Sequence, residues 1–361
     1  MSSYINMDKN MIVNETIGDV AVVWRDVTEA PFSLYGFSDV KPFFRRVPSA
    51  VAEATSEAVT RLSEESAGGR VRFSSNSPFV AIRAKFRTVG RSSHLTLLSS
   101  AGFDLYIDTE YGSRFVKEFR MKHDMEGGYE QIITLGEAKE RSFTIHFPIH
   151  SVVERLEVGL SPDATLGEAM PYRALDPIVI YGSSIVHGTA ATRPGLAYPA
   201  ILSRTLNIDA RNLGFSGNAR GEEAIAAWMA DLPMSVFVSD YDHNAPSVEH
   251  LEATHHALYE RIREKNPTVP YIMISRPNFF TRIDGGEDAL LRRDVVMRSY
   301  LKAREAGDKN VYFIDGMSFF MGEGCYDFSI DSVHPNDAGF LRMAEVIGTL
   351  IKHLLIADKC R

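Results

Sequence analysis

The spacing of apolar residues changes near residue 170, and this change constrains the fold more than any other feature of the sequence. Before that point, apolar and polar residues alternate in short runs such as Val80–Phe86, Phe143–Ile149 and Leu156–Leu160. A period of two, broken by polar or glycine-bearing turns, is typical of antiparallel sheets with one face in water. The sequence therefore predicts an antiparallel, jelly-roll-like β-sandwich for residues 1–170.

Further strands are expected in this first half at Ala21–Trp24, Val71–Ser74, Leu95–Ser99, Asp104–Asp108 and Gln131–Leu135. The segment Ala50–Ser66 is ambiguous, because its apolar residues also fit a short helix. Proline and small residues without periodicity then interrupt the pattern between Ser161 and Pro177, which indicates a linker and places a domain boundary near residues 165–175.

Beyond the linker, short apolar strands alternate with amphipathic helical segments, which is the pattern of a parallel sheet. The expected strands are Ile178–Tyr181, Ala210–Leu213, Ser235–Ser239, Tyr271–Ser275 and Val311–Ile314. The expected helices are Tyr198–Leu206, Glu222–Ala230, Val248–Lys265, Asp288–Glu305 and Asp337–Ile356. Residues 171–361 are therefore predicted to form a second, α/β domain.

Composition excludes several classes of function. The net charge of −8 and the absence of a dense Lys/Arg run argue against binding to nucleic acid. We find no secretory signal and no apolar run long enough to span a bilayer, so a cytoplasmic location without membrane association is expected. The two cysteines, Cys325 and Cys360, do not make a disulfide framework, and no motif indicates a cofactor or a metal.

Four polar blocks follow expected strands or precede the last helix, where an open α/β sheet gathers its ligands. They are Gly182-Ser183-Ser184, Asn212 to Asn218, Asp240 to Pro246, and Asp331 to Asn336. A serine in a tight turn after a strand can supply both a nucleophile and a backbone N–H donor. A carboxylate three residues before a histidine can accept from its Nδ1, which leaves Nε2 as a general base.

Taken in order, these blocks resemble those of the SGNH (GDSL-type) serine hydrolases. The resemblance covers residues 177–355 and implies a three-layer α/β domain in which Ser184 is the nucleophile and Asp331 and His334 complete a triad. It also implies that Gly217 and Asn244 join the N–H of Ser184 in an oxyanion hole. The first half adds Gly102-Phe103-Asp104-Leu105-Tyr106, which matches the Gly-x-Asp-Leu-Tyr motif of a β-sandwich that precedes one subgroup of these hydrolases.

The sequence departs from the family pattern at two places. Ser183 stands where the family usually has Asp, and Asn244 lacks the usual preceding Gly and following Asp. Ser216 is a rival nucleophile, although it matches no nucleophile-elbow pattern. His187 and His243 lie near the blocks and are interpreted as polar loop residues that could contact substrate.

The expected function is a serine esterase that hydrolyses short acyl esters, with acetyl favoured, of a small polar or carbohydrate alcohol. An acyltransferase with the same triad is the first alternative, and homo-oligomers are compatible with the sequence. A metallo-phosphoesterase would use Asp240, Asp242, His243, Asp331 and His334, but these residues show no recognised ligand spacing. A non-catalytic glycan-binding protein is a third alternative, against which the complete set of triad and oxyanion residues argues.

Overall fold

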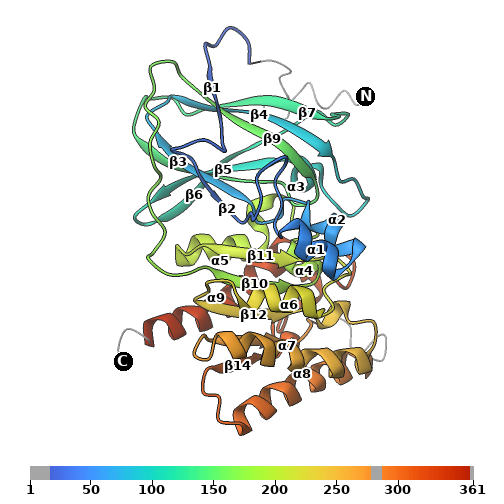
Figure 1. The fold of residues 1–361 in the computed structure, drawn as a ribbon. Helices are drawn as coiled ribbons and strands as arrows, with labels where there is room; N and C mark the ends of the chain where they lie inside the picture. The colour runs from blue at the N-terminus through green and yellow to red at the C-terminus, as the bar shows by residue number, and fades with distance from the viewer. Residues whose placement is uncertain (1–16, 278–286, 358–361) are drawn as a thin grey trace.

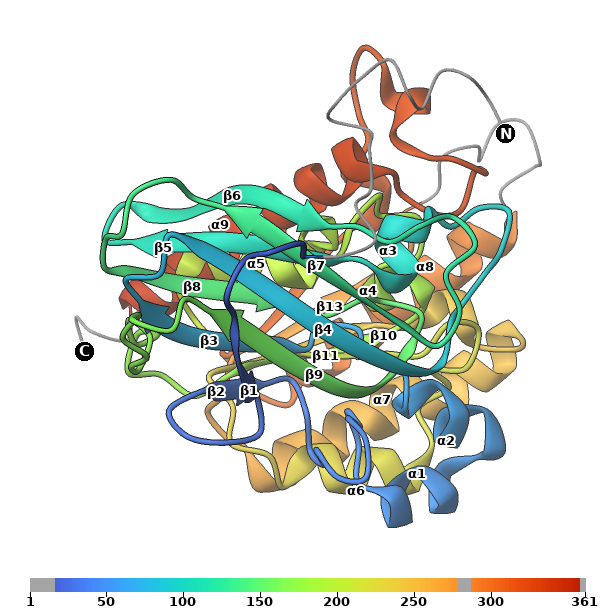
Figure 2. The same cartoon turned by 90° about the horizontal axis from the view of Figure 1, so that it is seen from above.

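A computed structural model describes residues 17–277 and 287–357 of the chain. Two antiparallel sheets lie face to face in its N-terminal part (Figures 1 and 2). In spatial order, one contains β1 (Val23–Asp26), β9 (Val152–Leu160), β4 (Phe79–Thr88) and β7 (Gly128–Thr134). The other contains β2 (Ser33–Tyr35), β3 (Arg70–Ser75), β8 (Arg141–His146), β5 (Phe103–Thr109) and β6 (Gly112–Phe119). One hydrophobic core joins the two sheets, which confirms the predicted β-sandwich.

In the part of this half that the structure describes, three helices interrupt the all-β pattern. The ambiguous segment forms α1 (Ser49–Thr55) and α2 (Glu57–Ser63), which lie at the junction with the second half of the molecule (Figure 1). The strand predicted at Leu95–Ser99 is wrong, because α3 (Leu97–Ala101) occupies most of this segment. Its physical cause is local: the Thr96 side chain accepts a hydrogen bond from the Ser99 N–H at 3.0 Å and thereby caps a helix.

The second half contains a parallel five-stranded sheet. Its order is β11 (Ala210–Gly214), β10 (Ile178–Gly182), β12 (Val236–Asp240), β13 (Tyr271–Ile274) and β14 (Val311–Ile314). Helices α5 (Tyr198–Leu206) and α9 (Asp337–Ala357) cover one face, and α6 (Glu223–Ala230), α7 (Val248–Lys265) and α8 (Glu287–Glu305) cover the other. This arrangement confirms the predicted α/β class and its parallel sheet.

The position of strand β10 inside the sheet explains why its sequence is almost wholly apolar. Ile178 and Ile180 belong to the core beneath α5 and α9, whereas Val179 and Tyr181 belong to the core beneath α6, α7 and α8. Both faces of the strand are therefore buried, as expected for the centre of a parallel sheet. In the sheet, β10 lies between β11 and β12. The chain leaves β10 toward the face covered by α5 and leaves β12 toward the face covered by α7. The loops that follow these two strands therefore diverge, and the switch point between them is a crevice.

The sandwich contacts the parallel sheet at its edge strand, β11. Arg46, which is fully buried, donates to the carbonyl oxygens of Asn212 at 3.1 Å and Gly214 at 2.9 Å. Arg70 donates to the carbonyl oxygen of Ala210 at 3.1 Å. Two arginines of the sandwich thus pair three backbone acceptors that an open sheet edge would leave free.

The N-terminal sheet strands end at Leu160, and the parallel sheet begins at Ile178. The division of the chain into residues 1–170 and 171–361 stays a prediction. In the described part of the chain, no helix combines the length and the apolar character that a membrane crossing requires.

Candidate active site

Ser184 lies at the carboxyl end of the central strand, in the crevice of the sheet. Strand β10 ends at Gly182, and the short helix α4 (Ser184–His187) begins two residues later. The Ser183 side chain caps this helix by accepting from the Ile185 N–H at 3.2 Å. Gly182 is required for close packing, because a Cβ atom there would lie 2.1 Å from the carbonyl oxygen of Asp240.

Ser184, His334 and Asp331 form a hydrogen-bonded line. The Oγ of Ser184 lies 2.9 Å from Nε2 of His334, and Nδ1 of His334 lies 2.6 Å from Oδ2 of Asp331. The second oxygen of Asp331 accepts the backbone N–H of His334 at 2.7 Å. The carboxylate therefore fixes both the backbone and the ring of the histidine, and it favours the tautomer whose Nε2 can accept a proton from Ser184.

The loop that carries Asp331 and His334 is held at its base. The carbonyl oxygen of His334 accepts from the Ile330 N–H at 3.1 Å and from the Ser329 hydroxyl at 3.0 Å. Partial burial raises the pKa of Asp331, but hydrogen bonds from His334 and from the Val333 N–H outweigh it, so that this pKa lies below its ordinary value. Asp331 is therefore ionised at neutral pH.

Gly217 and Asn244 both line the cleft beside Ser184. Gly217 has φ +72°, a left-handed conformation that glycine adopts at little cost. Oδ1 of Asn244 accepts the Ala219 N–H at 3.2 Å, which fixes the amide plane. Among the described residues, neither the Gly217 N–H, the Ser184 N–H nor the Nδ2 of Asn244 has a hydrogen-bond acceptor. These three donors are available to a group bound in the cleft.

The cleft around Ser184 measures about 500 Å³ and draws its lining from both halves of the molecule. The sandwich half contributes Arg61, Leu62, Glu65, His94, Leu95 and His150. The α/β half contributes Ser184, Thr189, Ser216, Gly217, His243, Asn244, Val333 and His334. The ring of His94 stacks near that of His334, with 6.0 Å between centroids. Most lining residues carry a polar side chain.

Ser216, the rival nucleophile, also faces an imidazole. Its Oγ lies 3.1 Å from Nδ1 of His187, and Nε2 of His187 lies 3.2 Å from Oε2 of Glu65. The same Nδ1 accepts the backbone N–H of Ser216 at 3.4 Å. Burial, assisted by the nearby Arg46, lowers the pKa of His187 to about 4, which makes it a weak base for Ser216.

The interpretation of His187 as a polar loop residue is wrong. It ends the four-residue helix α4 and is fully buried, with its Nε2 facing Glu65 and the carbonyl oxygen of Ile149 in the sandwich half. His243 lines the cleft, and its buried Nε2 has no partner among the described residues.

Among the described residues, the five that a metallo-phosphoesterase would use do not form one metal-binding group. Two of its members, Asp331 and His334, pair with each other opposite Ser184. Within residues 17–277 and 287–357, the set of side chains spaced closely enough to share a metal ion is instead Glu65, His150 and His187.

Reasoning from sequence missed the residues that the sandwich contributes. Glu65 and His150 belong to no motif and come from segments that look structural in the sequence. Their approach to Ser184 depends on how the two halves pack. The alternation of apolar and polar residues in the first half gives no indication of this packing.

The comparisons with known proteins agree with this geometry. The model of the GDSL-like lipase/acylhydrolase family matches residues 175–352. A second family model, GxDLY, which describes the N-terminus of SGNH hydrolase-type esterases, matches residues 22–166. The two matches follow each other and cover most of the chain. The chain belongs to the GDSL-like, SGNH-type hydrolases, and its enzyme class is that of the carboxylic ester hydrolases.

Solved structures share this fold over nearly the whole chain. A protein from Bacteroides ovatus, named a GDSL-like lipase, has 27% identity and a TM-score of 0.84, with 93% of this chain and 98% of that chain covered. The salicylyl-acyltransferase SsfX3 of a tetracycline biosynthetic pathway has 21% identity and a TM-score of 0.73, with 90% and 95% covered. A family two carbohydrate esterase from Clostridium thermocellum, in complex with cellohexaose, has 16% identity and a TM-score of 0.58, with 80% and 93% covered. A search of curated proteins found no match.

Proposed function

We propose that this protein is a serine esterase that removes a short acyl group, preferably acetyl, from a small polar or carbohydrate alcohol. The observation that carries the proposal is the line from Ser184 Oγ through His334 to Asp331, with distances of 2.9 and 2.6 Å. Three free donors lie beside this line in the same cleft. Nucleophile, base, orienting carboxylate and anion-stabilising donors are the elements that acyl transfer requires.

In the first step, Nε2 of His334 takes the hydroxyl proton of Ser184 while Oγ attacks the ester carbonyl. The negative charge that develops on the carbonyl oxygen is stabilised by the N–H groups of Ser184 and Gly217 and by Nδ2 of Asn244. Collapse of the tetrahedral intermediate releases the alcohol, which receives the proton from His334. An acyl-enzyme on Ser184 remains.

In the second step, His334 removes a proton from water, and the resulting nucleophile attacks the acyl-enzyme. The same donors stabilise the second tetrahedral intermediate, and its collapse releases the acid and returns the proton to Ser184. Asp331 remains ionised throughout and stabilises the imidazolium that forms in both steps.

Two features support a polar or carbohydrate alcohol. The cleft is about 500 Å³, and its lining includes the polar side chains of Arg61, His94 and His150. Structural neighbours include carbohydrate esterases, one of them solved with cellohexaose, which supports a carbohydrate alcohol by analogy of fold.

Activity on a substrate series tests this proposal. We expect p-nitrophenyl acetate to be hydrolysed with a higher kcat/KM than the butyrate and octanoate esters, followed by release of acetate from acetylated sugars. Ser184→Ala and His334→Ala should each lower kcat by about 10⁶. Activity that survives in Ser184→Ala would refute the assignment of the nucleophile, and a preference for octanoate would refute the short acyl group.

An acyltransferase is the second candidate, because the salicylyl-acyltransferase SsfX3 shares the fold over 90% of this chain. The triad chemistry is the same, and only the acceptor differs. Product analysis with a competing alcohol distinguishes the two: hydrolysis gives free acid as the main product, whereas transfer gives a new ester.

A further inference from the structure

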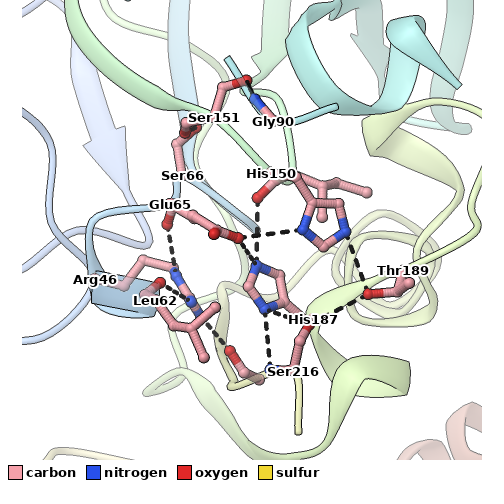
Figure 3. A network of polar contacts seen from close by, with 12 residues as sticks. Arg46, Leu62, Glu65, Ser66, Gly90, His150, Ser151, His187, Thr189 and Ser216 are labelled. Atoms are coloured by element: carbon pink, nitrogen blue, oxygen red, sulfur yellow. Dashed lines mark hydrogen bonds and ion pairs between the residues drawn. The ribbon is translucent and has the colours of Figure 1, made fainter. Parts of the chain in front are cut away.

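A closed ring of polar side chains links the two halves of the molecule beside the cleft (Figure 3). Oε2 of Glu65 lies 3.2 Å from Nδ1 of His150 and 3.2 Å from Nε2 of His187. Nε2 of His150 lies 3.2 Å from Oγ1 of Thr189, which lies 3.3 Å from Oγ of Ser216. Oγ of Ser216 returns to Nδ1 of His187 at 3.1 Å. Glu65 and His150 come from the sandwich half, and the other three come from the α/β half.

The hydrogen bonds of this ring converge on Glu65. Because Nδ1 of His187 accepts the Ser216 N–H, the ring proton of a neutral His187 is on Nε2, which faces Glu65 and the carbonyl oxygen of Ile149 at 3.3 Å. His150 can donate from Nδ1 to the same carboxylate while its Nε2 accepts from Thr189. Glu65 is therefore placed to accept the ring N–H of His187 and can also accept that of His150.

The electrostatics of the ring match this arrangement. Burial raises the pKa of Glu65, but hydrogen bonds from His150 and His187 outweigh it and hold this pKa well below its ordinary value. Burial and the guanidinium of Arg46 lower the pKa of His187 to about 4. At neutral pH the ring holds an ionised Glu65 and a neutral His187, beside the buried cation of Arg46.

One member of the ring, Ser216, supplies the carbonyl group of the peptide unit that contains the Gly217 N–H. The carbonyl of Ser216 and the N–H of Gly217 belong to one planar peptide unit and point in opposite directions. Nδ2 of Asn218 donates to the Ser216 carbonyl at 2.8 Å, while His187 accepts the Ser216 N–H on the other side of the same residue. The orientation of the Gly217 N–H thus depends on contacts that hold Ser216 in place.

We propose that Glu65 is a positioning residue for the oxyanion hole: it holds His187, which holds Ser216 and so aims the Gly217 N–H into the cleft. The sandwich half is then part of the catalytic apparatus rather than only a neighbour. This inference rests on the proposed function, because it assigns a purpose to the oxyanion donor of that mechanism. In this assignment Glu65 acts through His187 rather than directly on the reacting atoms.

A metal ion held by Glu65, His150 and His187 is a competing interpretation, because their ligand atoms are close enough to share one. Two observations favour the hydrogen-bonded ring. Nδ1 of His187 accepts the Ser216 N–H, so its Nε2, the atom that faces Glu65, carries the ring proton and offers a metal ion no lone pair. The fully buried guanidinium of Arg46 lies nearby, and it already compensates the charge of Glu65.

The first experiment measures kcat and KM for p-nitrophenyl acetate in Glu65→Ala, Glu65→Gln and a matched control, Glu64→Ala. Glu64 neighbours Glu65 but pairs with Arg45 at 2.9 Å, away from the ring. We expect Glu65→Ala to lower kcat about ten-fold with KM within about two-fold, less than the 10²–10³ for complete loss of a donor. Glu65→Gln, which keeps one acceptor oxygen, should recover part of kcat, and Glu64→Ala should match the wild type. Thermal unfolding of each variant is measured to check that the variant is folded.

The second experiment tests whether Glu65 acts through His187. His187→Phe preserves a buried ring but removes the acceptor for Ser216, so Glu65→Ala should have no further effect on kcat in that background. Additive effects, a change confined to KM, or an unchanged kcat in Glu65→Ala would each overturn the inference. Ser184→Ala is assayed in parallel. If it is inactive while Glu65→Ala is normal, only this inference fails; if it is active, the proposed function itself fails.

Discussion

The Oγ of Ser184 and the Nε2 of His334 lie 2.9 Å apart, although 150 positions separate the two residues in the chain. The central strand β10 delivers the serine, and the loop before α9 delivers the histidine to the same edge of the sheet. The contact therefore depends on the tertiary structure of the α/β half and not on local sequence. Catalytic competence and folding of this half are expected to be lost together.

Asp331→Asn tests the role of the carboxylate. The amide keeps the size of the side chain but can donate to Nδ1 of His334, which favours the tautomer that cannot accept the Ser184 proton. We expect kcat to fall by about 10⁴ with the fold intact. Steady-state kinetics measure it, with Asp327→Asn in the same loop region as the control. A loss smaller than about ten-fold would contradict the role of Asp331 as the orienting group.

Asn244→Ala tests the side-chain donor of the oxyanion hole. Removal of Nδ2 should lower kcat by about 10²–10³ and change KM little, because the charge on the carbonyl oxygen develops only in the transition state. Asn310→Ala, before β14 at the opposite edge of the sheet, is the control. An unchanged rate would remove Asn244 from the mechanism and leave the triad standing.

Arg46→Met tests the contact between the sandwich and the edge of the parallel sheet. Arg46 is fully buried and donates to four backbone carbonyl oxygens, those of Leu62, Glu65, Asn212 and Gly214. Methionine fills much of the space but leaves these acceptors unpaired, so we expect the free energy of unfolding to fall by about 3–5 kcal/mol. Chemical denaturation measures it. Arg45→Met, which removes a partly exposed ion pair with Glu64, should change stability by less than about 1 kcal/mol.

Asp240→Asn tests a buried carboxyl group behind the nucleophile. Burial, with Asp242 nearby, raises the pKa of Asp240 to about 7, while the Tyr198 hydroxyl donates to it at 3.1 Å. The pKa of Asp240 is therefore higher in the folded than in the unfolded protein. The protonated carboxyl group contributes to stability at pH values below the unfolded pKa, and this contribution is lost as pH rises through about 7.

Asparagine does not ionise, so Asp240→Asn should gain stability over the wild type as pH rises from about 4 to about 8, by on the order of 4 kcal/mol. Denaturation curves across this pH range measure the difference. A difference that does not change with pH would show that Asp240 does not titrate as its burial implies.

The sequence alone predicts much of the α/β half. Helices α5 and α7 and strand β14 begin and end at the predicted residues, because strong periodicity and clear breaks define them. Ser184, His334 and Asp331 meet as their blocks suggest, since parallel strands bring their carboxyl ends to one edge of a sheet.

The remainder depends on tertiary packing or on local chemistry that periodicity does not record. The apolar run at Leu97 and Leu98 suggests a strand, yet the cap provided by Thr96 makes it a helix. Glu65 reaches the cleft only because the sandwich covers the edge of β11, and its segment shows no catalytic pattern. Residues contributed from the other half of the molecule are the ones that a single sequence conceals.

Covalent labelling of Ser184 tests the central claim most directly. Incubation with a fluorophosphonate, followed by intact-mass and peptide mass spectrometry, should show one label on the peptide that contains Ser184. The label should be absent from Ser184→Ala and present in Ser216→Ala, with its rate of formation strongly reduced in His334→Ala. A label on Ser216, or no label on a protein that hydrolyses p-nitrophenyl acetate, would contradict the account.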